Sequence, residues 1–60
     1  MLEDIRTYAR LQLGISDMTR QQYVAAVRAY AIEQHGDTDE VKMHADRTAR
    51  HLWASTPKNG

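Results

Sequence analysis

Two internal glycines, Gly14 and Gly36, divide the sequence into three stretches in which apolar residues recur every three or four positions. This spacing places apolar side chains on one face of an α-helix, and no run of four residues alternates as a half-buried strand does. The pattern predicts an all-α fold: a small three-helix bundle, with helices over residues 2–13, 19–35 and 38–54, that a second copy could stabilise as a homodimer. The polar residues 55–60 are expected to form a mobile tail.

The start of the second stretch carries two signals for a helix N-terminus. Thr19 and Gln22 have the spacing of a capping box, in which each side chain accepts a hydrogen bond from the backbone N–H of the other. Met18 and Tyr23 have the spacing of a hydrophobic staple across the same turn. These four residues predict that the second helix begins at Thr19.

Glycine and acidic residues mark the other helix ends. Gly14 follows the first stretch, where we expect it to adopt the left-handed conformation that often ends a helix. Gly36 is expected to end the second helix. Asp37 precedes the third stretch and Glu40 lies three residues later, which predicts that Asp37 caps the third helix.

The predicted core combines apolar side chains from all three stretches. The middle stretch has the widest apolar arc, so we expect its helix to contact both of the others. A chain of 60 residues forms one domain at most, and its stability is expected to be roughly 3–9 kcal/mol. The residues expected in the core are Ile5, Ala9, Leu13, Tyr23, Val27, Tyr30, Val41, Ala45 and Leu52.

Composition narrows the setting and the class of function. The sequence has no cysteine, which excludes disulfides and thiolate metal sites, and no apolar run long enough to cross a membrane. Its first residues lack the basic-then-apolar order of a signal peptide, so we expect a cytoplasmic protein that does not act on membranes. Eight basic residues balance eight acidic ones, and the chain lacks the positive net charge that drives nonspecific nucleic-acid binding.

No residue pattern indicates catalysis, a cofactor or a small-molecule substrate. The acidic residues cluster at helix starts, where capping explains them, and the sequence has no phosphate-binding glycine loop. His44 and His51 are seven positions apart, which puts them about 10 Å from each other on a helix, too far to share a metal ion. We expect no metal site and no enzyme activity.

The third stretch offers one candidate surface for a protein partner. Met43, Arg47 and Arg50 point away from the predicted core, and His51 lies at the edge of this face. The face combines an adaptable apolar side chain with planar cations, a composition found in recognition surfaces. An ordinary solvated helix face with one exposed methionine has the same composition.

The second stretch offers another candidate surface, suited to a partner or to a second copy of the chain. Ala25 and Ala29 lie opposite its main apolar arc, and they would permit close approach of another helix, with Ile32 as an anchor. A homodimer through such a face would add the buried area that a short chain lacks. Alanine is also the best helix former, so these residues equally fit a plain exposed face.

Residues 13–19, with the sequence Leu-Gly-Ile-Ser-Asp-Met-Thr, resemble the turn of helix-turn-helix DNA-binding domains. In that family the turn is followed by a threonine that starts the recognition helix, and Tyr23 is similar to the apolar residue that packs this helix inward. The resemblance covers residues 9–23, within which Arg10 and Arg20 replace a small residue and a buried Val or Ile. It implies a surface facing the DNA major groove, made of Ser16, Asp17, Thr19, Arg20, Gln21 and Gln22. The same residues also fit a helix stop followed by a capped helix.

Two functions follow from these observations. The first is a non-catalytic helical binding module, such as an adaptor, inhibitor or regulatory protein, that docks onto a protein partner or its own copy. The alternative is a small helix-turn-helix DNA-binding regulator, in which Arg20 would contact guanine and the neighbouring glutamines adenine.

Overall fold

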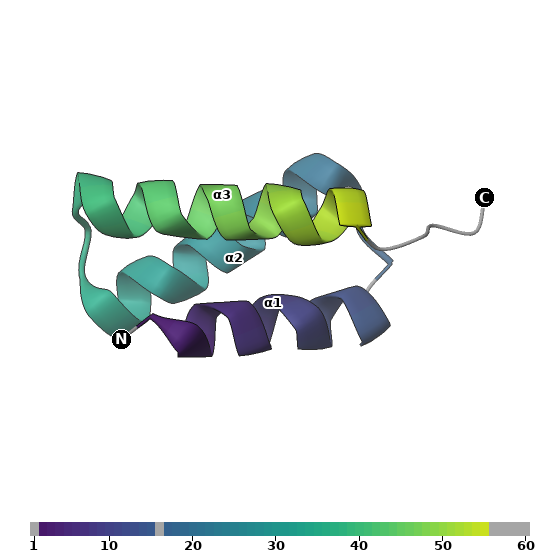
Figure 1. Ribbon diagram of the computed structural model, residues 1–60, viewed down its shortest axis with the longest axis horizontal. Coiled ribbons are helices and arrows are strands. Elements are labelled where there is room, and N and C mark those ends of the chain that lie inside the picture. The colour runs from purple at the N-terminus through teal and green to yellow at the C-terminus, as the bar shows by residue number, and fades with distance from the viewer. Residues whose placement is uncertain (1, 16, 56–60) are drawn as a thin grey trace.

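Three helices make up the fold of this chain, whose computed structural model describes residues 2–15 and 17–55. They are α1 (Glu3–Ile15), α2 (Arg20–His35) and α3 (Asp39–Ser55), and the described residues contain no strand. The helices run in alternating directions, so the start of α1, the end of α2 and the start of α3 lie at one end of the molecule (Figure 1). The prediction of an all-α three-helix bundle is confirmed. None of the described helices has the length and apolar character needed to span a bilayer.

The N-terminus of α2 forms as the sequence predicts. The Gln22 backbone N–H donates to Thr19 Oγ1 over 3.2 Å, and the Thr19 backbone N–H donates to Gln22 Oε1 over 3.1 Å. This is the complete capping box, which satisfies donors that the first helical turn leaves unpaired. Met18 is half-buried and packs against the core, of which Tyr23 is a member.

The two internal glycines differ in role, and the prediction for Gly14 is wrong. Gly14 lies inside α1, which continues through Ile15, and its φ is not positive. Gly36 does end α2, with φ 105° and ψ 156°, a region that only glycine adopts readily. The Gly36 N–H donates to the carbonyl oxygen of Ile32 over 2.8 Å, which closes the helix.

Thr38, and not Asp37, caps α3. The Val41 backbone N–H donates to Thr38 Oγ1 over 3.2 Å, and the Lys42 N–H donates to the Thr38 carbonyl over 3.0 Å. The Asp37 carboxylate instead lies 3.2 Å from Lys42 Nζ. At its other end α3 includes Ser55, which the sequence places in the tail, and residues 56–60 lie outside the described part of the chain.

The core lies along the axis between the three helices, with α2 packed most extensively against α3. Every predicted core residue is buried except Leu13 and Tyr30, which are half-buried and pack against the core from its edge. Each of these two lies near the boundary of its helix's apolar face. The buried residues are Ile5, Ala9, Tyr23, Val24, Val27, Ala31, Val41, Ala45, Ala49 and Leu52.

Candidate docking surface

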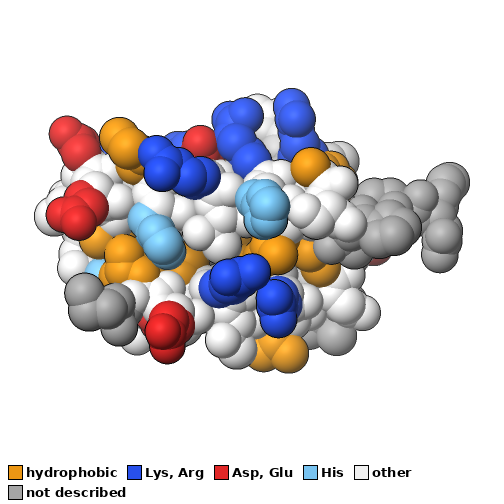
Figure 2. Space-filling view, in the orientation of Figure 1, with side chains coloured by type: hydrophobic (Ala, Val, Ile, Leu, Met, Phe, Trp, Pro, Cys, Tyr) orange, Lys and Arg blue, Asp and Glu red, His pale blue; other side chains and the backbone are white. Residues whose placement is uncertain are grey.

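Acidic side chains collect at one end of the molecule although the chain has no net charge. Because the helices alternate in direction, that end holds the first turns of α1 and α3 together with the last turn of α2 (Figure 1). An acidic first turn suits the helix dipole, which accounts for four of these residues locally. Figure 2 shows most of the red side chains of this face near the same end. The group consists of Glu3, Asp4, Glu33, Asp37, Asp39 and Glu40.

Arginines occupy the middle and the opposite end of the α2 and α3 helices. Arg28 and Arg47 lie near the middle of their helices, Arg50 lies one turn further along α3, and Arg20 opens α2. A cation in the first turn of a helix is disfavoured by the helix dipole, and the first turn of α2 contains no acidic residue. The helix dipole therefore does not explain Arg20 at this position.

A groove of about 460 Å³ lies between α2 and α3 and gathers three of these arginines. Arg28 Nη2 and Arg50 Nε each donate to a separate oxygen of Asp46, both over 3.0 Å. One carboxylate thus holds two guanidinium groups side by side, and most of their N–H donors still face solvent. The groove is lined by Arg20, Gln21, Val24, Ala25, Arg28 and Arg50.

Asp46 does not line the groove itself, but it pairs with Arg28 and Arg50, which do. Partial burial by itself raises the pKa of Asp46, but hydrogen bonds from Arg50 and Arg28, together with their charges, outweigh it and hold the pKa below the usual value. Asp46 therefore stays ionised at neutral pH and positions both arginines. The residues that line the groove include three arginines and no acidic residue, and Asp46 pairs with two of the three, so the net charge there is positive.

The partner residues predicted on α3 are all exposed, but they divide between two sides of the helix. Arg50 lines the α2–α3 groove, whereas Arg47 and His51 line a second groove between α1 and α3. Met43 is 58% exposed and lines neither groove.

Of the three partner residues predicted on α2, only one lines the α2–α3 groove. Ala25 and Ala29 are exposed, and Ile32 is half-buried. Ala25 belongs to the α2–α3 groove and so lies in one site with Arg50, while Ala29 and Ile32 lie outside both grooves.

Two of the residues assigned to DNA contact fall in the α2–α3 groove. Arg20 and Gln21 both line it, so the structure joins them to Arg28 and Arg50, which sequence spacing did not connect. The side chains of Thr19 and Gln22 are used in the capping box. Asp17 is exposed, and Ser16 lies outside the described residues.

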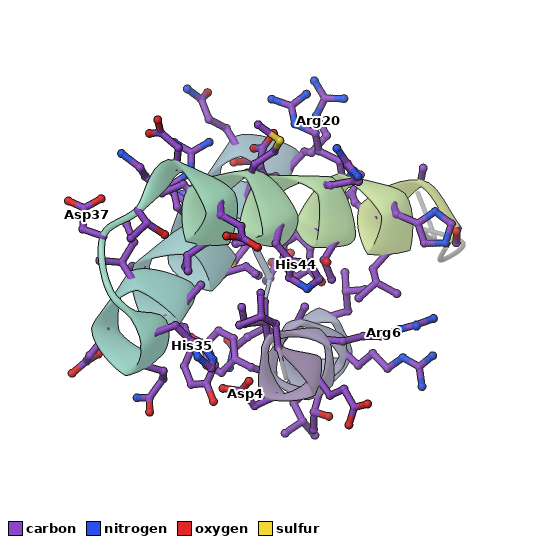
Figure 3. All side chains as sticks on the ribbon, turned by 60° about the vertical axis from the view of Figure 1, so that its left-hand side comes forward. Asp4, Arg6, Arg20, His35, Asp37 and His44 are labelled. Carbon is purple, nitrogen blue, oxygen red and sulfur yellow. The ribbon has the colours of Figure 1, made fainter. Side chains whose placement is uncertain are left out.

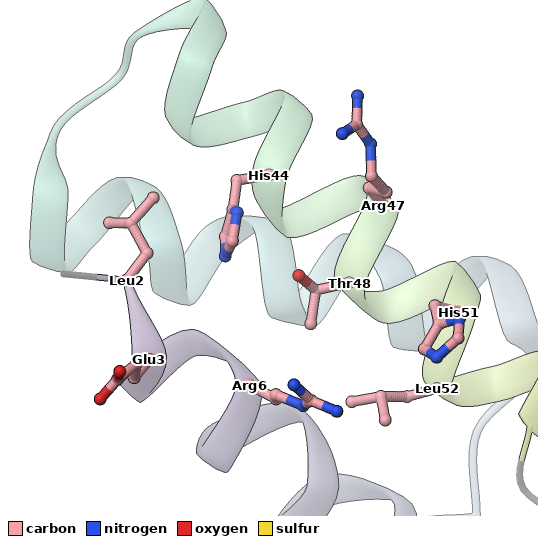
Figure 4. A pocket seen from close by; sticks show the side chains of 8 residues that line it. All are labelled: Leu2, Glu3, Arg6, His44, Arg47, Thr48, His51 and Leu52. Atoms are coloured by element: carbon pink, nitrogen blue, oxygen red, sulfur yellow. The ribbon is translucent and has the colours of Figure 1, made fainter.

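The groove between α1 and α3 has a volume of about 540 Å³ and mixes apolar, basic and imidazole side chains. His44, Thr48 and His51 come from one face of α3, and Arg6 reaches across from α1 toward Leu52 (Figure 4). Spacing along α3 places His44 and His51 on the same helix face, but only the packing of α1 reveals Arg6. Its lining residues are Leu2, Glu3, Arg6, His44, Arg47, Thr48, His51 and Leu52.

A polar cluster joins α1 to the end of α2 at the acidic end. His35 Nε2 lies 2.9 and 3.0 Å from the two oxygens of Asp4 (Figure 3). The Tyr30 hydroxyl also donates to Asp4, over 3.0 Å. Partial burial raises the pKa of Asp4, but the hydrogen bonds from His35 and Tyr30 and the charge of His35 outweigh this and lower the pKa. Tyr30 also stacks on Tyr8, with ring centroids 4.2 Å apart. The cluster holds helices together and needs no ligand to explain it.

Comparisons with known proteins do not identify a family for this chain. No protein-family model, curated protein or solved structure matches the chain. Among the described residues, no group of three or more His, Cys, Asp or Glu side chains is placed to hold a metal ion.

Proposed function

We propose that this chain is a non-catalytic helical binding module that docks onto a protein partner in the cytoplasm, with the α2–α3 groove as its docking site. The observation that supports the proposal is a groove lined by three arginines, Arg20, Arg28 and Arg50, of which Arg28 and Arg50 are held by the carboxylate of Asp46. The partner segment that fits this groove is acidic.

Guanidinium chemistry explains why an acidic partner fits. Each arginine presents several N–H donors in a planar fork that matches a carboxylate, and charge-assisted hydrogen bonds of this kind are about twice as strong as neutral ones. Asp46 holds Arg28 and Arg50 in place before binding, so little side-chain entropy is lost on docking. Val24 and Ala25 supply an apolar wall against which aliphatic parts of the partner can pack.

Arg20 provides the sharpest test, because it opens α2 and makes no ion pair or hydrogen bond within the described residues. The immobilised chain is used to capture proteins from nuclease-treated host lysate, and each captured protein is compared between wild type and variants. Arg20→Glu is expected to lose the specific partner, because it puts a negative charge in the groove. Arg10→Glu makes the same charge change on an exposed part of α1 and is expected to retain the partner. Equal capture by both variants would count against the groove.

DNA binding is the second candidate, and the exposure of Arg20 and Gln21 in the same basic groove favours it. Arginine recognises guanine and glutamine recognises adenine in the major groove. This candidate predicts binding to duplex fragments that weakens steeply as salt rises, and loss of that binding in Arg20→Ala. No mobility shift of genomic duplex fragments at low salt would eliminate it.

A further inference from the structure

The solvent-facing side of α3 carries three exposed residues in a row: Glu40, Met43 and Arg47, here named the α3 stripe. They are spaced by three and four positions, so they lie on one helix face, opposite the buried Val41 and Ala45. Met43 is 58% exposed, one of the two most exposed large apolar residues in the described part of the chain.

The two charges of the α3 stripe have no partner within the described residues. Neither Glu40 nor Arg47 forms an ion pair or a hydrogen bond there, whereas Lys42, Asp46 and Arg50 on the same helix are all paired. Glu40 and Arg47 cannot pair with each other, because seven residues of helix separate them by about 10 Å. Opposite charges thus stand on either side of an exposed methionine, and neither is neutralised within the chain.

The α3 stripe is complementary in charge to the α3 stripe of a second copy that runs in the opposite direction. A two-fold axis through Met43, perpendicular to α3, sets a second copy of the helix antiparallel to the first. Glu40 then lies opposite Arg47 of the partner subunit, Arg47 lies opposite Glu40 of the partner subunit, and the two methionines meet at the axis. Such an isologous contact closes a dimer and cannot propagate.

We propose that the chain forms a homodimer through antiparallel pairing of the α3 stripe with that of a second copy. The segregation of charge in the whole molecule favours the same orientation, because antiparallel packing brings the acidic end of one copy toward the arginines of the other. Parallel packing brings acid against acid. Contact along one helix face falls in the small, weak class of interfaces, so the dimer forms at high protein concentration.

The homodimer is a separate proposal from the docking of another protein in the α2–α3 groove, and it does not depend on that docking. None of the three residues of the α3 stripe lines that groove. The two ideas therefore have separate tests: Arg20→Glu addresses the groove, and the charges at Glu40 and Arg47 address the dimer.

Charge reversal distinguishes self-pairing from every other use of the α3 stripe. Oligomeric state is measured by light scattering and sedimentation velocity over a concentration series, at low and high salt. Glu40→Arg and Arg47→Glu each place like charges opposite each other twice, and each is expected to weaken the dimer by about tenfold or more. An equimolar mixture of these two variants restores both ion pairs and is expected to form a heterodimer. The double variant Glu40→Arg/Arg47→Glu is expected to regain the homodimer.

Matched controls separate the contact from the effect of net charge. Glu33→Arg and Arg10→Glu make the same two charge changes at exposed positions outside the α3 stripe, and they are expected to dimerise as the wild type does. All four single-variant positions are exposed, and circular dichroism checks that each variant keeps its helix content. A wild type that stays monomeric at every concentration, or a mixture of the two stripe variants that stays monomeric, would overturn the proposal. If the chain is monomeric but still captures a partner that depends on Arg20, the homodimer proposal fails and the groove proposal is retained.

Discussion

Tyr23 links all three helices, and its removal gives the most direct test of the packing. It lies on α2, is 1% exposed, and its hydroxyl donates to the carbonyl oxygen of Ala9 on α1 over 2.7 Å. Its ring packs at 38° against Trp53 on α3, with centroids 5.4 Å apart. Burial raises the pKa of the hydroxyl, so the group remains a hydrogen-bond donor throughout the neutral range.

Two substitutions separate the hydrogen bond of Tyr23 from its ring. Tyr23→Phe removes the donor alone and is expected to cost about 0.5–1.5 kcal/mol, since the Ala9 carbonyl keeps its partner within α1. Tyr23→Ala also leaves a cavity among the helices and is expected to cost about 3–5 kcal/mol. The second value approaches the roughly 3–9 kcal/mol that holds a chain of this size together, so much of the Tyr23→Ala protein should be unfolded at room temperature.

Thermal and urea unfolding, followed by circular dichroism at the helical band, measure both effects. A loss of 1 kcal/mol lowers the Tm of a domain this small by about 4–8 °C, which is easily resolved. Tyr8→Phe is the matched control, because the Tyr8 hydroxyl makes no hydrogen bond within the described residues and its ring stacks on Tyr30. It is expected to change the Tm little. If Tyr23→Phe matches the wild type and Tyr23→Ala costs only about 1 kcal/mol, Tyr23 does not connect the helices as described.

Four further predictions concern helix ends and pH. Gly14→Ala is expected to stabilise the protein by up to about 1 kcal/mol, because Gly14 is helical and a Cβ there meets nothing within 4 Å. Gly36→Ala, measured by the same unfolding curves, is expected to destabilise it by about 1–3 kcal/mol, because φ is 105°. Thr19→Ala removes one half of the capping box and is expected to cost about 1 kcal/mol in urea titrations. The folded-state pKa of Asp4 lies below its ordinary 3.8, so its contribution to stability is complete above that pH and is lost as the pH falls through the folded pKa. Asp4→Asn should therefore be less stable at neutral pH and lose less of its stability on acidification, and equal acid profiles would contradict the Asp4–His35 contact.

The sequence predicted those features of the fold that depend on neighbouring residues. The capping box of Thr19 and Gln22 involves only one turn, so its spacing was sufficient to locate the start of α2. Asp37 and Thr38 are both good caps, and sequence alone could not choose between them. The structure selects Thr38, because α3 begins at Asp39 and only Thr38 then reaches the Val41 N–H.

Gly14 shows where a local rule fails. Glycine ends a helix when the chain must turn through the left-handed conformation, but it is also tolerated within the last turn of a helix at a cost of up to about 1 kcal/mol. In this chain the second outcome holds, because α1 continues through Gly14 to Ile15. The spacing of apolar residues around Gly14 does not show whether the helix ends at this glycine or continues through it.

The candidate site depends on contacts between residues far apart in sequence. Arg28 and Asp46 are 18 positions apart, and nothing in the local pattern of either helix pairs them. Likewise, Tyr30 has the periodicity of a core residue but is half-buried, because its hydroxyl reaches Asp4 on α1. Periodicity identified the faces of each helix correctly, whereas the partners across the bundle required the structure.

The charge pattern shows why a sum over the sequence can mislead about binding. Equal numbers of acidic and basic residues give no net charge, which argued against nonspecific binding to nucleic acid. The alternating helices, however, bring acids at positions 3, 4, 33, 37, 39 and 40 to one end and leave arginines over the rest of α2 and α3 (Figure 2). A nearby partner experiences the local potential of the face that it approaches and not the total charge. The same neutral chain therefore carries a basic groove between α2 and α3 and opposite charges on either side of Met43, which are the features that the two proposals use.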